Sequence, residues 1–484
     1  MGGCSSTAFA AGGADAMPMR RAVEACVGAD GDRAQLRAYI LSRAPTALDG
    51  LRRLRGPDLA SSVAALADGF KRWQPEPRAA PAPRAAGAAH VRIDETALRG
   101  ISLPQLRAYV ADAAKRCKKE AWKSRSGEPL TPEALTLYDL ATHAIGPLAA
   151  ATGLSVVETL ADGPQPPAWF VSHWWGEDLL SFIKCLEQHC KDRKLDEATT
   201  YYWVCAYALR QSALDDELDG GVGVSPFMRA IQLCDGTISV LDGKAIAISR
   251  AWCALELYET TLGRGAAYLH DIYTAHEFDN RQGEHFSAVG LVDGLGAADN
   301  GSMYNKSYRE RYFPLGTLGG AKAFALRGAE ASREEDLAAI RRQVGVNEQR
   351  LDRTVRARFG LQQLPALMRT DAQGTAEQLR ALLDDLRGSQ LRKLRVTFEV
   401  QVELSAAAMA QLGASLPASL EELVLYHGGG GPAIAQPLCK LIKDGRLPRL
   451  RTLHLNHLKL GDEAGIALAK VIKGNPTLTD VNLK

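Results

Sequence analysis

The stretch AWFVSHWWGEDLL, residues 168–180, brings unusual side chains to the end of an apolar run. The run Trp169–Val171 has the aromatic and β-branched character of a buried strand. Ser172 and His173 follow it, and a hydroxyl beside an imidazole is the combination that hydrolases use as nucleophile and base. Because adjacent strand residues point to opposite faces of a sheet, a dyad of these two residues is disfavoured. The stretch therefore indicates a binding wall at the end of a strand.

A carboxylate near an aromatic residue stands on a second segment, ISRAWCALELYETTLG, which predicts a helix over residues 248–263. Trp252 and Glu256 are four residues apart, so they share one face of this helix. An aromatic ring beside a carboxylate excludes water and strengthens its electrostatic effect. Strand ends and helix starts at one edge of an open sheet line the same crevice, so we expect these two residues to lie opposite His173 and Trp174.

The elements that would position these residues alternate between strand and helix, which predicts an α/β sheet. Apolar runs of β-branched and aromatic type predict four strands, over residues 168–172, 201–206, 236–241 and 266–269. The helical spacing of apolar residues predicts helices between these strands, over residues 179–189, 226–233 and 248–263.

The order of these elements and two motifs resembles a TIR domain, the Toll/interleukin-receptor/resistance-protein fold, over residues 166–275. The motifs are the loop ending in Gly176-Glu177-Asp178 after the first strand and the helical sequence WCALEL, residues 252–257. The form SHWWGE is also similar to uncharacterised algal and protist proteins. The resemblance implies a flavodoxin-like parallel sheet.

In TIR domains that cleave NAD, the glutamate of this helix is catalytic, so the resemblance implies Glu256 as the catalytic residue and NAD as a substrate. Cleavage of the nicotinamide–ribose bond builds positive charge on the sugar, which a preorganised carboxylate stabilises. A tryptophan of the first loop would stack on nicotinamide or adenine, the histidine would bind a phosphate or ribose oxygen, and the amides near Gly176 would favour an anion. The predicted substrate-binding residues are His173, Trp174, Trp175, Gly176 and Trp252.

Two other interpretations of this region stay open. Glu256 can be a surface carboxylate that pairs with an arginine or lysine. Many TIR domains are adaptors without activity, so the region can also be a scaffold that self-associates. A third, weaker interpretation is a structural protein whose site has decayed.

The final third of the chain contains a repeat. The pattern Leu391-x-x-Leu394-x-Val396 recurs from Leu420, Leu450 and Leu478, at intervals of 29, 30 and 28 residues. This is the leucine-rich-repeat strand pattern, in which alternate leucines point inward and an intervening helix covers the other side. Residues 461–478 resemble the helical half of a ribonuclease-inhibitor-type repeat. Residues 376–484 are therefore predicted to form an α/β solenoid that binds a protein partner.

The chain begins MGGCSS, which fits the pattern for N-myristoylation at Gly2, with Cys4 placed for S-palmitoylation. One acyl chain binds membranes only marginally, so a second one matters. Two acyl chains, which require a eukaryotic source, would make the protein cytoplasmic and membrane-associated. The alternative is a Gly/Ser-rich start that is never acylated.

The remaining segments are predicted from composition. Residues 1–16 form the acylated tail, 17–73 a small helical segment, 74–90 a Pro/Ala-rich linker, 91–165 a second helical segment and 276–375 a helical or irregular connector. A helix is expected over residues 103–122, and its basic second half would either dock on anionic lipid or face solvent.

Composition excludes several classes of function for a chain of 484 residues. A net charge of +2 argues against a nucleic-acid-coating surface, so no nucleic acid is expected as a partner. The nine cysteines are scattered without a CxxC pair, which argues against a zinc site and favours a reducing intracellular compartment. No cofactor or metal is expected. GTLGGAKAF, residues 316–324, is not a phosphate loop because Ala323 follows the lysine.

Together these observations predict a membrane-tethered intracellular signalling protein. Its TIR-like domain would cleave NAD through Glu256 and self-associate, and its repeats would hold a protein partner. The alternative is a TIR-like and leucine-rich-repeat scaffold without catalysis.

Overall fold

The computed structural model describes residues 90–218, 221–264, 268–280, 283–293, 310–372, 374–398 and 403–483. These residues belong to one unit, residues 88–484. The predicted acylation residues Gly2 and Cys4, the predicted segments 1–16 and 17–73, and all but the last residue of the predicted linker 74–90 lie outside the described residues. Within those described ranges, no helix has the length and apolar character needed to cross a membrane.

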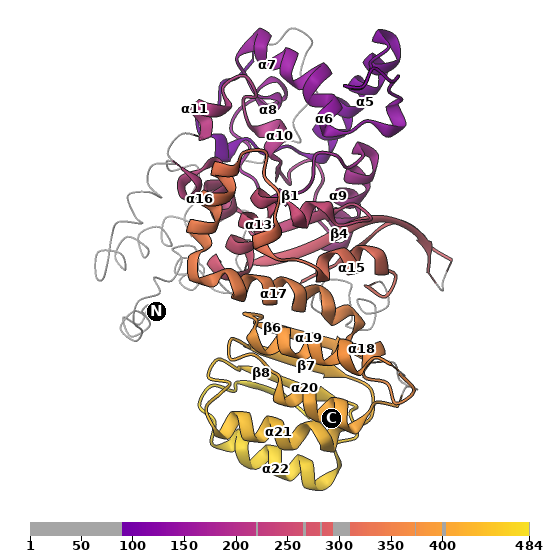
Figure 1. Cartoon of the computed structure of the whole chain (residues 1–484), viewed down its shortest axis with the longest axis vertical. Helices are drawn as coiled ribbons and strands as arrows, with labels where there is room; N and C mark the ends of the chain where they lie inside the picture. Colours follow the sequence, from indigo (N-terminus) through magenta and orange to yellow (C-terminus); the bar gives the residue numbers. More distant parts are fainter. Residues whose placement is uncertain are drawn as a thin grey trace, which may run out of the picture. The chain divides into compact units, whose positions relative to one another are not determined.

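A five-stranded sheet with the order β2-β1-β3-β4-β5 forms the centre of the first α/β region (Figure 1). Its strands are β1 (Trp169–Ser172), β2 (Tyr202–Trp203), β3 (Gly236–Leu241), β4 (Leu269–Asp279) and β5 (His285–Leu291). The first four strands are parallel, and β5 pairs with β4 in the antiparallel sense. The predicted strands 168–172 and 236–241 are confirmed. The strand predicted over 201–206 is shorter, because α10 (Cys205–Ala208) begins directly after Val204.

The sheet continues beyond residue 275, the predicted end of the first α/β domain. Strand β4 runs on to Asp279, and β5 pairs with it through Ile272–Leu291 and Tyr273–Gly290. A side chain at Gly290 would place its Cβ 2.4 Å from Tyr273 Cε1, so glycine lets the tyrosine ring lie against β5. The segment predicted as a helical or irregular connector, 276–375, therefore begins inside the sheet.

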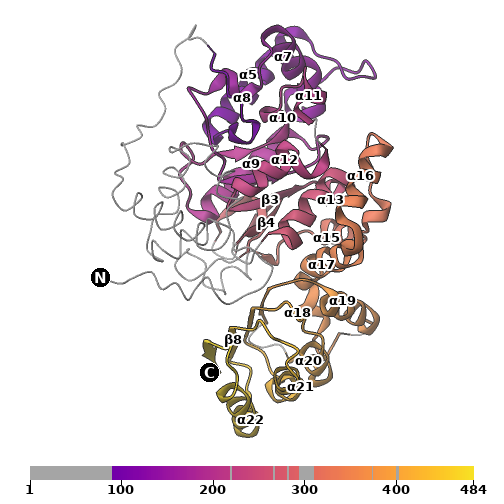
Figure 2. The same ribbon diagram turned by 90° about the vertical axis from the view of Figure 1, so that its left-hand side faces the viewer.

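Helices cover both faces of this sheet. On one face, α9 (Leu179–Arg193) packs against β1 through the rings of Trp169 and His189, whose centroids are 4.4 Å apart. On the other face, Phe170 and Trp203 lie in one core with residues of the remaining helices. Figure 2 shows α13, α15, α16 and α17 gathered beside the sheet. The helices of this second face are α12 (Pro226–Leu233), α13 (Ala251–Tyr258), α15 (Leu315–Lys322), α16 (Glu334–Val344) and α17 (Glu348–Gly360).

The residues before β1 seal the β2 edge of the sheet. Ile101 and Tyr202 exchange two backbone hydrogen bonds of 2.8 Å, and Trp203 Nε1 donates to the carbonyl of Thr96 at 3.0 Å. An edge that is paired in this way offers no free strand to another chain. The helices of this segment are α5 (Leu103–Glu120), α6 (Leu137–Leu140), α7 (Gly146–Thr152) and α8 (Val156–Leu160).

The helix predicted over residues 103–122 is confirmed as α5. Ser102 caps its first turn, and Leu106 and Val110 are buried on its inner side. The helix stops at Glu120 because Ala121 adopts a left-handed conformation with φ of 50°. In its basic second half, the exposed guanidinium of Arg116 pairs with Glu120 at 2.9 Å.

A second sheet, of four parallel strands in the order β6-β7-β8-β9, contains the repeated leucines. Leu394, Leu423 and Leu453 occupy one register and are fully buried. The chain is therefore α/β, with two sheets whose strands are mainly parallel, as the sequence predicts. The strands are β6 (Lys393–Thr397), β7 (Glu422–Tyr426), β8 (Thr452–Asn456) and β9 (Asp480–Asn482), and the helices are α18 (Leu364–Leu367), α19 (Ala376–Gly388), α20 (Ala406–Ala414), α21 (Gly431–Lys443) and α22 (Gly461–Lys473).

Candidate active site

Glu256 lies inside the protein, against the carboxyl end of strand β1. It belongs to α13 and is only 4% exposed. Burial raises the pKa of its carboxyl group to about 8, although hydrogen bonds from Ser172 and Cys253 oppose the rise. Glu256 Oε2 has no hydrogen-bond partner among the described residues. At neutral pH the group is mainly a neutral acid, and the alternative of a surface carboxylate in an ion pair is wrong.

His173 follows the same strand but its ring lies on the opposite face of the sheet. Its ring centroid is 4.7 Å from that of Phe182, which belongs to α9. Burial lowers the pKa of the imidazole to about 4, against a smaller opposing effect of the backbone of Trp174. His173 Nε2 is buried and has no partner within the described part of the chain. Only the His173 carbonyl meets the Glu256 helix, where it accepts from Cys253 Sγ at 3.6 Å.

Glu177 is a second buried acid, which our site prediction did not include. It is 6% exposed, and neither carboxyl oxygen has a partner among the residues that the structure describes. Burial raises the pKa of Glu177 well above its ordinary value, and the charges of Asp242 and Asp178 add to the rise. Burial raises the pKa of the Cys185 thiol, and the charge of Glu177 adds to the rise. Because Cys185 belongs to α9, this interaction places Glu177 on the α9 side of the sheet with His173. The Gly-Glu-Asp motif was the signal that could have identified it.

The two loop tryptophans make internal contacts. Trp174 folds back over its own loop, so that a Cβ at Gly176 would lie 2.2 Å from Trp174 Cζ2. Trp175 Nε1 donates to Cys205 Sγ at 3.4 Å, and its ring lies 5.9 Å from that of Tyr138. Both rings are thus held by contacts within the protein while remaining partly exposed.

Trp252 does not form the predicted aromatic wall beside Glu256. Its ring stacks on Phe227 of α12 at 5.2 Å with an interplanar angle of 26°. Its Nε1 donates to Asp336 Oδ2 in α16 at 3.2 Å. The residue therefore ties α13 to two neighbouring helices, and the proposed crevice between Trp252 and His173 is not assembled.

The helix start after Gly176 is already capped. Asp178 is the N-cap of α9, and its Oδ1 accepts from Ser181 N at 2.8 Å. The Glu177 amide donates to the Trp174 carbonyl at 3.2 Å. The carboxylate of Asp178 thus occupies the position where we expected the amides to favour a substrate anion.

Replacing Gly176 with alanine is expected to displace Trp174 and to lower the free energy of unfolding by about 1–3 kcal/mol, because the new methyl group overlaps the indole. Chemical denaturation of the single and double variants measures this effect. In a Trp174→Phe background the same change should cost less, since phenylalanine lacks the overlapping atoms. Equal costs in both backgrounds would contradict this placement of Trp174.

The arrangement that remains is a set of buried acids and a neutral histidine at the carboxyl end of β1. Glu256 and Ser172 lie on the α13 side, and His173 and Glu177 lie on the α9 side. Within the described ranges, no group of three or more His, Cys, Asp or Glu side chains could hold a metal ion. Such a site can perform acid–base chemistry or stabilise a developing cation. Comparisons with protein-family models, curated proteins and solved structures give no match.

Proposed function

We propose that this chain is a TIR-like signalling protein whose Glu256 cleaves NAD. The observation that supports the proposal is the set of buried polar atoms without partners at one strand end: Glu256 Oε2, His173 Nε2 and both carboxyl oxygens of Glu177. Each unsatisfied buried group costs about 1–3 kcal/mol, so these groups, which flank the carboxyl end of β1 on the two faces of the sheet, are candidates for a role other than stability. Perturbed pKa values of buried acids also gather at functional sites.

The chemistry of glycosidic cleavage suits a buried glutamate. The bond between nicotinamide and ribose breaks with positive charge on the sugar, which an ionised Glu256 would stabilise. The nicotinamide ring of NAD⁺ is itself cationic, and a cation beside the carboxyl group lowers its pKa. Substrate binding would therefore ionise the acid that burial keeps neutral in the free protein. Ser172, which hydrogen-bonds the carboxyl group, would keep it oriented.

The test is an assay of NAD⁺ loss and nicotinamide release by the purified full chain, free and after clustering on beads. Glu256→Gln is expected to lower the rate by about 100-fold or more, as removal of a stabilising group for a transition-state charge does. Glu463→Gln, which changes an exposed glutamate of α22, should retain the wild-type rate. A clustered wild type that leaves NAD⁺ intact, or an unchanged rate in Glu256→Gln, would overturn the proposal.

A scaffold without catalysis is the second candidate. The contacts of Trp252 with Phe227 and Asp336 favour it, because they give the WCALEL motif a packing role that needs no substrate. In this case the first α/β region self-associates, and the second sheet, which contains the repeated leucines, binds a protein partner. Self-association measured by sedimentation would then persist in Glu256→Gln while NAD⁺ is left intact. Membrane tethering through Gly2 and Cys4 stays a prediction from the sequence in both cases.

A further inference from the structure

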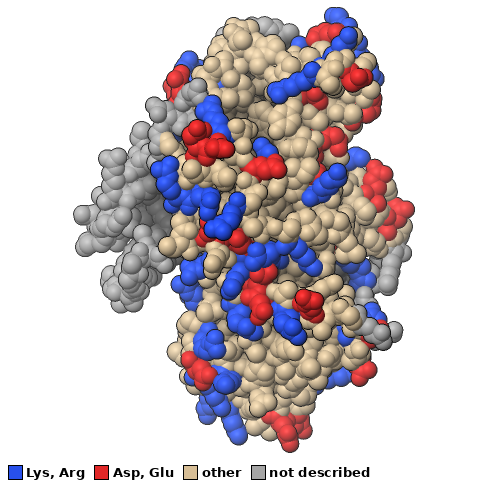
Figure 3. Space-filling model, in the orientation of Figure 1, with Lys and Arg blue, Asp and Glu red and all other residues tan. Residues whose placement is uncertain are grey.

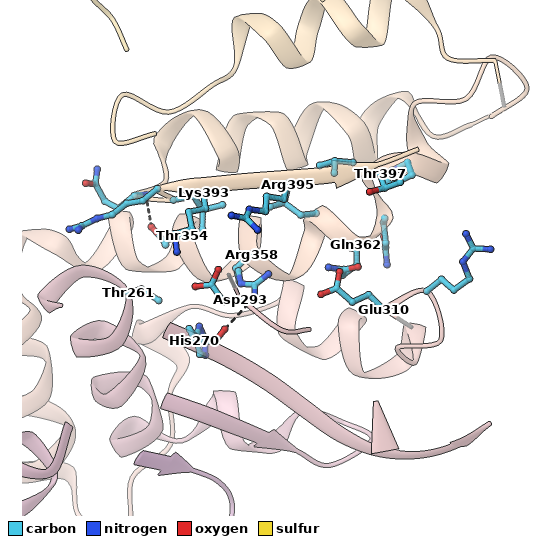
Figure 4. A pocket seen from close by; sticks show the side chains of 18 of the residues that line it. Thr261, His270, Asp293, Glu310, Thr354, Arg358, Gln362, Lys393, Arg395 and Thr397 are labelled. Atoms are coloured by element: carbon cyan, nitrogen blue, oxygen red, sulfur yellow. Dashed lines mark hydrogen bonds between the residues drawn. The ribbon is translucent and has the colours of Figure 1, made fainter. Parts of the chain in front are cut away.

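A cavity of about 380 Å³ lies at the opposite end of the first sheet from Glu256. Its walls come from the amino ends of the strands, where His270 is the second residue of β4, from α17 with Thr354 and Arg358, and from β6 of the second sheet. Figure 4 shows Lys393 and Arg395 directed from β6 toward Arg358. The volume is within the range of roughly 300–1,000 Å³ that small-molecule sites occupy.

The lining of this cavity is strongly basic. Seven lysines and arginines line it, against two acidic residues, Asp293 and Glu310. The chain as a whole has a net charge of only +2, and Figure 3 shows basic and acidic side chains interspersed over the face it displays. The excess of cations is therefore a local property of the cavity.

Two of these cations have no carboxylate partner within ion-pair distance in the described parts of the chain, Arg358 and Lys393. By contrast, Arg395 pairs with Glu422, Arg392 with Glu421 at 3.9 Å, and Arg369 with Asp371 at 2.6 Å. Cations held together without counter-charges repel one another, so an anion that enters the cavity lowers the energy of the arrangement.

Arg358 is held in place by backbone contacts that do not neutralise it. Its Nη2 donates to the carbonyls of His270 and Leu291, at 3.4 Å each. His270 adds no charge at neutral pH, because burial, helped by the charge of Arg358, lowers the pKa of the imidazole to about 4. A guanidinium fixed in this way retains donors that can form paired hydrogen bonds with phosphate oxygens.

A third polar group in the cavity is the hydroxyl of Thr397. Thr397 Oγ1 is a buried oxygen with no hydrogen-bond partner among the described residues. Lys393, Arg395 and Thr397 are spaced two residues apart on β6, so all three point to the same face. Apolar residues complete the wall around them, including Phe398 and Leu404. The cavity thus combines a row of donors with an apolar surface.

We propose that this cavity binds a small molecule carrying two or more phosphate groups, such as a nucleoside triphosphate or an inositol polyphosphate. A single negative charge would leave one of the two cations without a carboxylate partner, Arg358 or Lys393, uncompensated, whereas a ligand with two or more phosphate groups can meet both. Residues of both sheets and of α17 line the cavity. The bound ligand would therefore stabilise the packing of the first α/β region against the second sheet, β6-β7-β8-β9. This site is separate from Glu256, so it stands whether or not the chain cleaves NAD.

The experiment is calorimetric titration of the full chain with inorganic triphosphate, ATP and inositol hexakisphosphate at low salt. Lys393→Gln removes one unpaired cation and is expected to weaken binding about tenfold, the effect of losing one charge-assisted hydrogen bond. Lys393→Arg keeps the charge and should bind nearly as tightly as the wild type. Lys470→Gln makes the same charge change at an exposed position of α22 and should leave the affinity unchanged.

The three probes also identify the class of ligand. Tighter binding of ATP than of inorganic triphosphate would assign a nucleotide whose base meets the apolar wall, and tightest binding of inositol hexakisphosphate would assign a phosphorylated polyol. The proposal is overturned if none of the probes binds at millimolar concentration. It is also overturned if Lys470→Gln weakens binding as much as Lys393→Gln, since that result shows only diffuse charge attraction.

Discussion

Replacing Glu256 with glutamine is expected to make the free energy of unfolding depend less on pH. In the wild type this free energy falls as pH rises, because Glu256 ionises inside the protein. The folded pKa of Glu256 is about 8, against an ordinary value of 4.5. The folded chain therefore binds more protons than the unfolded chain between these values, and the free energy of unfolding falls as pH increases through this window. The full loss is on the order of 5 kcal/mol above pH 8, from about 1.4 kcal/mol for each unit of pKa.

Chemical denaturation at pH 5 and pH 9 measures this effect. The difference in unfolding free energy between Glu256→Gln and the wild type should grow with pH, because glutamine does not ionise. Glu463→Gln, at an exposed site, should follow the wild type at both pH values. A constant difference between Glu256→Gln and the wild type across this range would mean that the carboxyl group is not buried as described.

This stability measurement complements the NAD⁺ assay. A variant that is more stable at high pH and has lost catalysis identifies a residue kept for function at a cost in stability. A variant that gains stability while the wild type has no activity would instead support the scaffold. The two measurements on the same protein thus separate the candidate functions.

Replacing Glu158 with alanine is expected to destabilise the fold by about 3–5 kcal/mol, the usual cost of breaking a buried ion pair. Glu158 is fully buried in α8 and accepts hydrogen bonds from Arg210, at 2.5 and 3.0 Å, and from the amides of Ile93 and Ser155, both at 2.8 Å. Arg99 lies 3.8 Å away with its side chain fully buried. Without Glu158 these two arginines would lose a counter-charge inside the protein.

The pH dependence of this network has the opposite sign to that of Glu256. Burial alone would raise the pKa of Glu158, but hydrogen bonds from Arg210, Ser155 and Ile93 and the charge of Arg99 lower it to about 2. Its contribution is therefore present above pH 4.5 and is lost as pH falls toward 2. Thermal unfolding at neutral pH tests the substitution. Glu277→Ala, which removes an exposed partner of Lys184, should unfold near the wild-type temperature; a similar result for Glu158→Ala would contradict the network.

The sequence predicts the elements of this fold better than their extent. The runs at β1 and β3 are rich in aromatic and β-branched residues and are buried along their whole length, which makes them recognisable. The β5 segment, His285–Leu291, mixes polar, small and apolar residues because its first half is partly exposed at the sheet edge. Its place beside β4 depends on the ring of Tyr273 over Gly290, a contact that no local pattern reveals.

The candidate site shows a similar limit. Spacing correctly separates Ser172 from His173, since strand alternation is a local rule. Spacing also places Trp252 and Glu256 on one helical face, but the tertiary partners decide what each does. Trp252 bonds Asp336, which is 84 residues later, and Glu256 meets the strand end. The basic cavity draws on residues from β4 to β6, so no single motif could have indicated it.

The seal on the β2 edge has a consequence for protein synthesis. The hydrogen bond from Trp203 to Thr96 at this edge joins residues that are 107 positions apart in the chain. The segment that seals the edge leaves the ribosome first, and at roughly 5–20 residues per second it waits roughly 5–20 s for β2 to follow. During that time Ile93, Leu98 and Ile101, all buried in the finished fold, have no sheet to cover. We therefore expect the nascent chain to bind chaperones that hold apolar segments until translation passes residue 203.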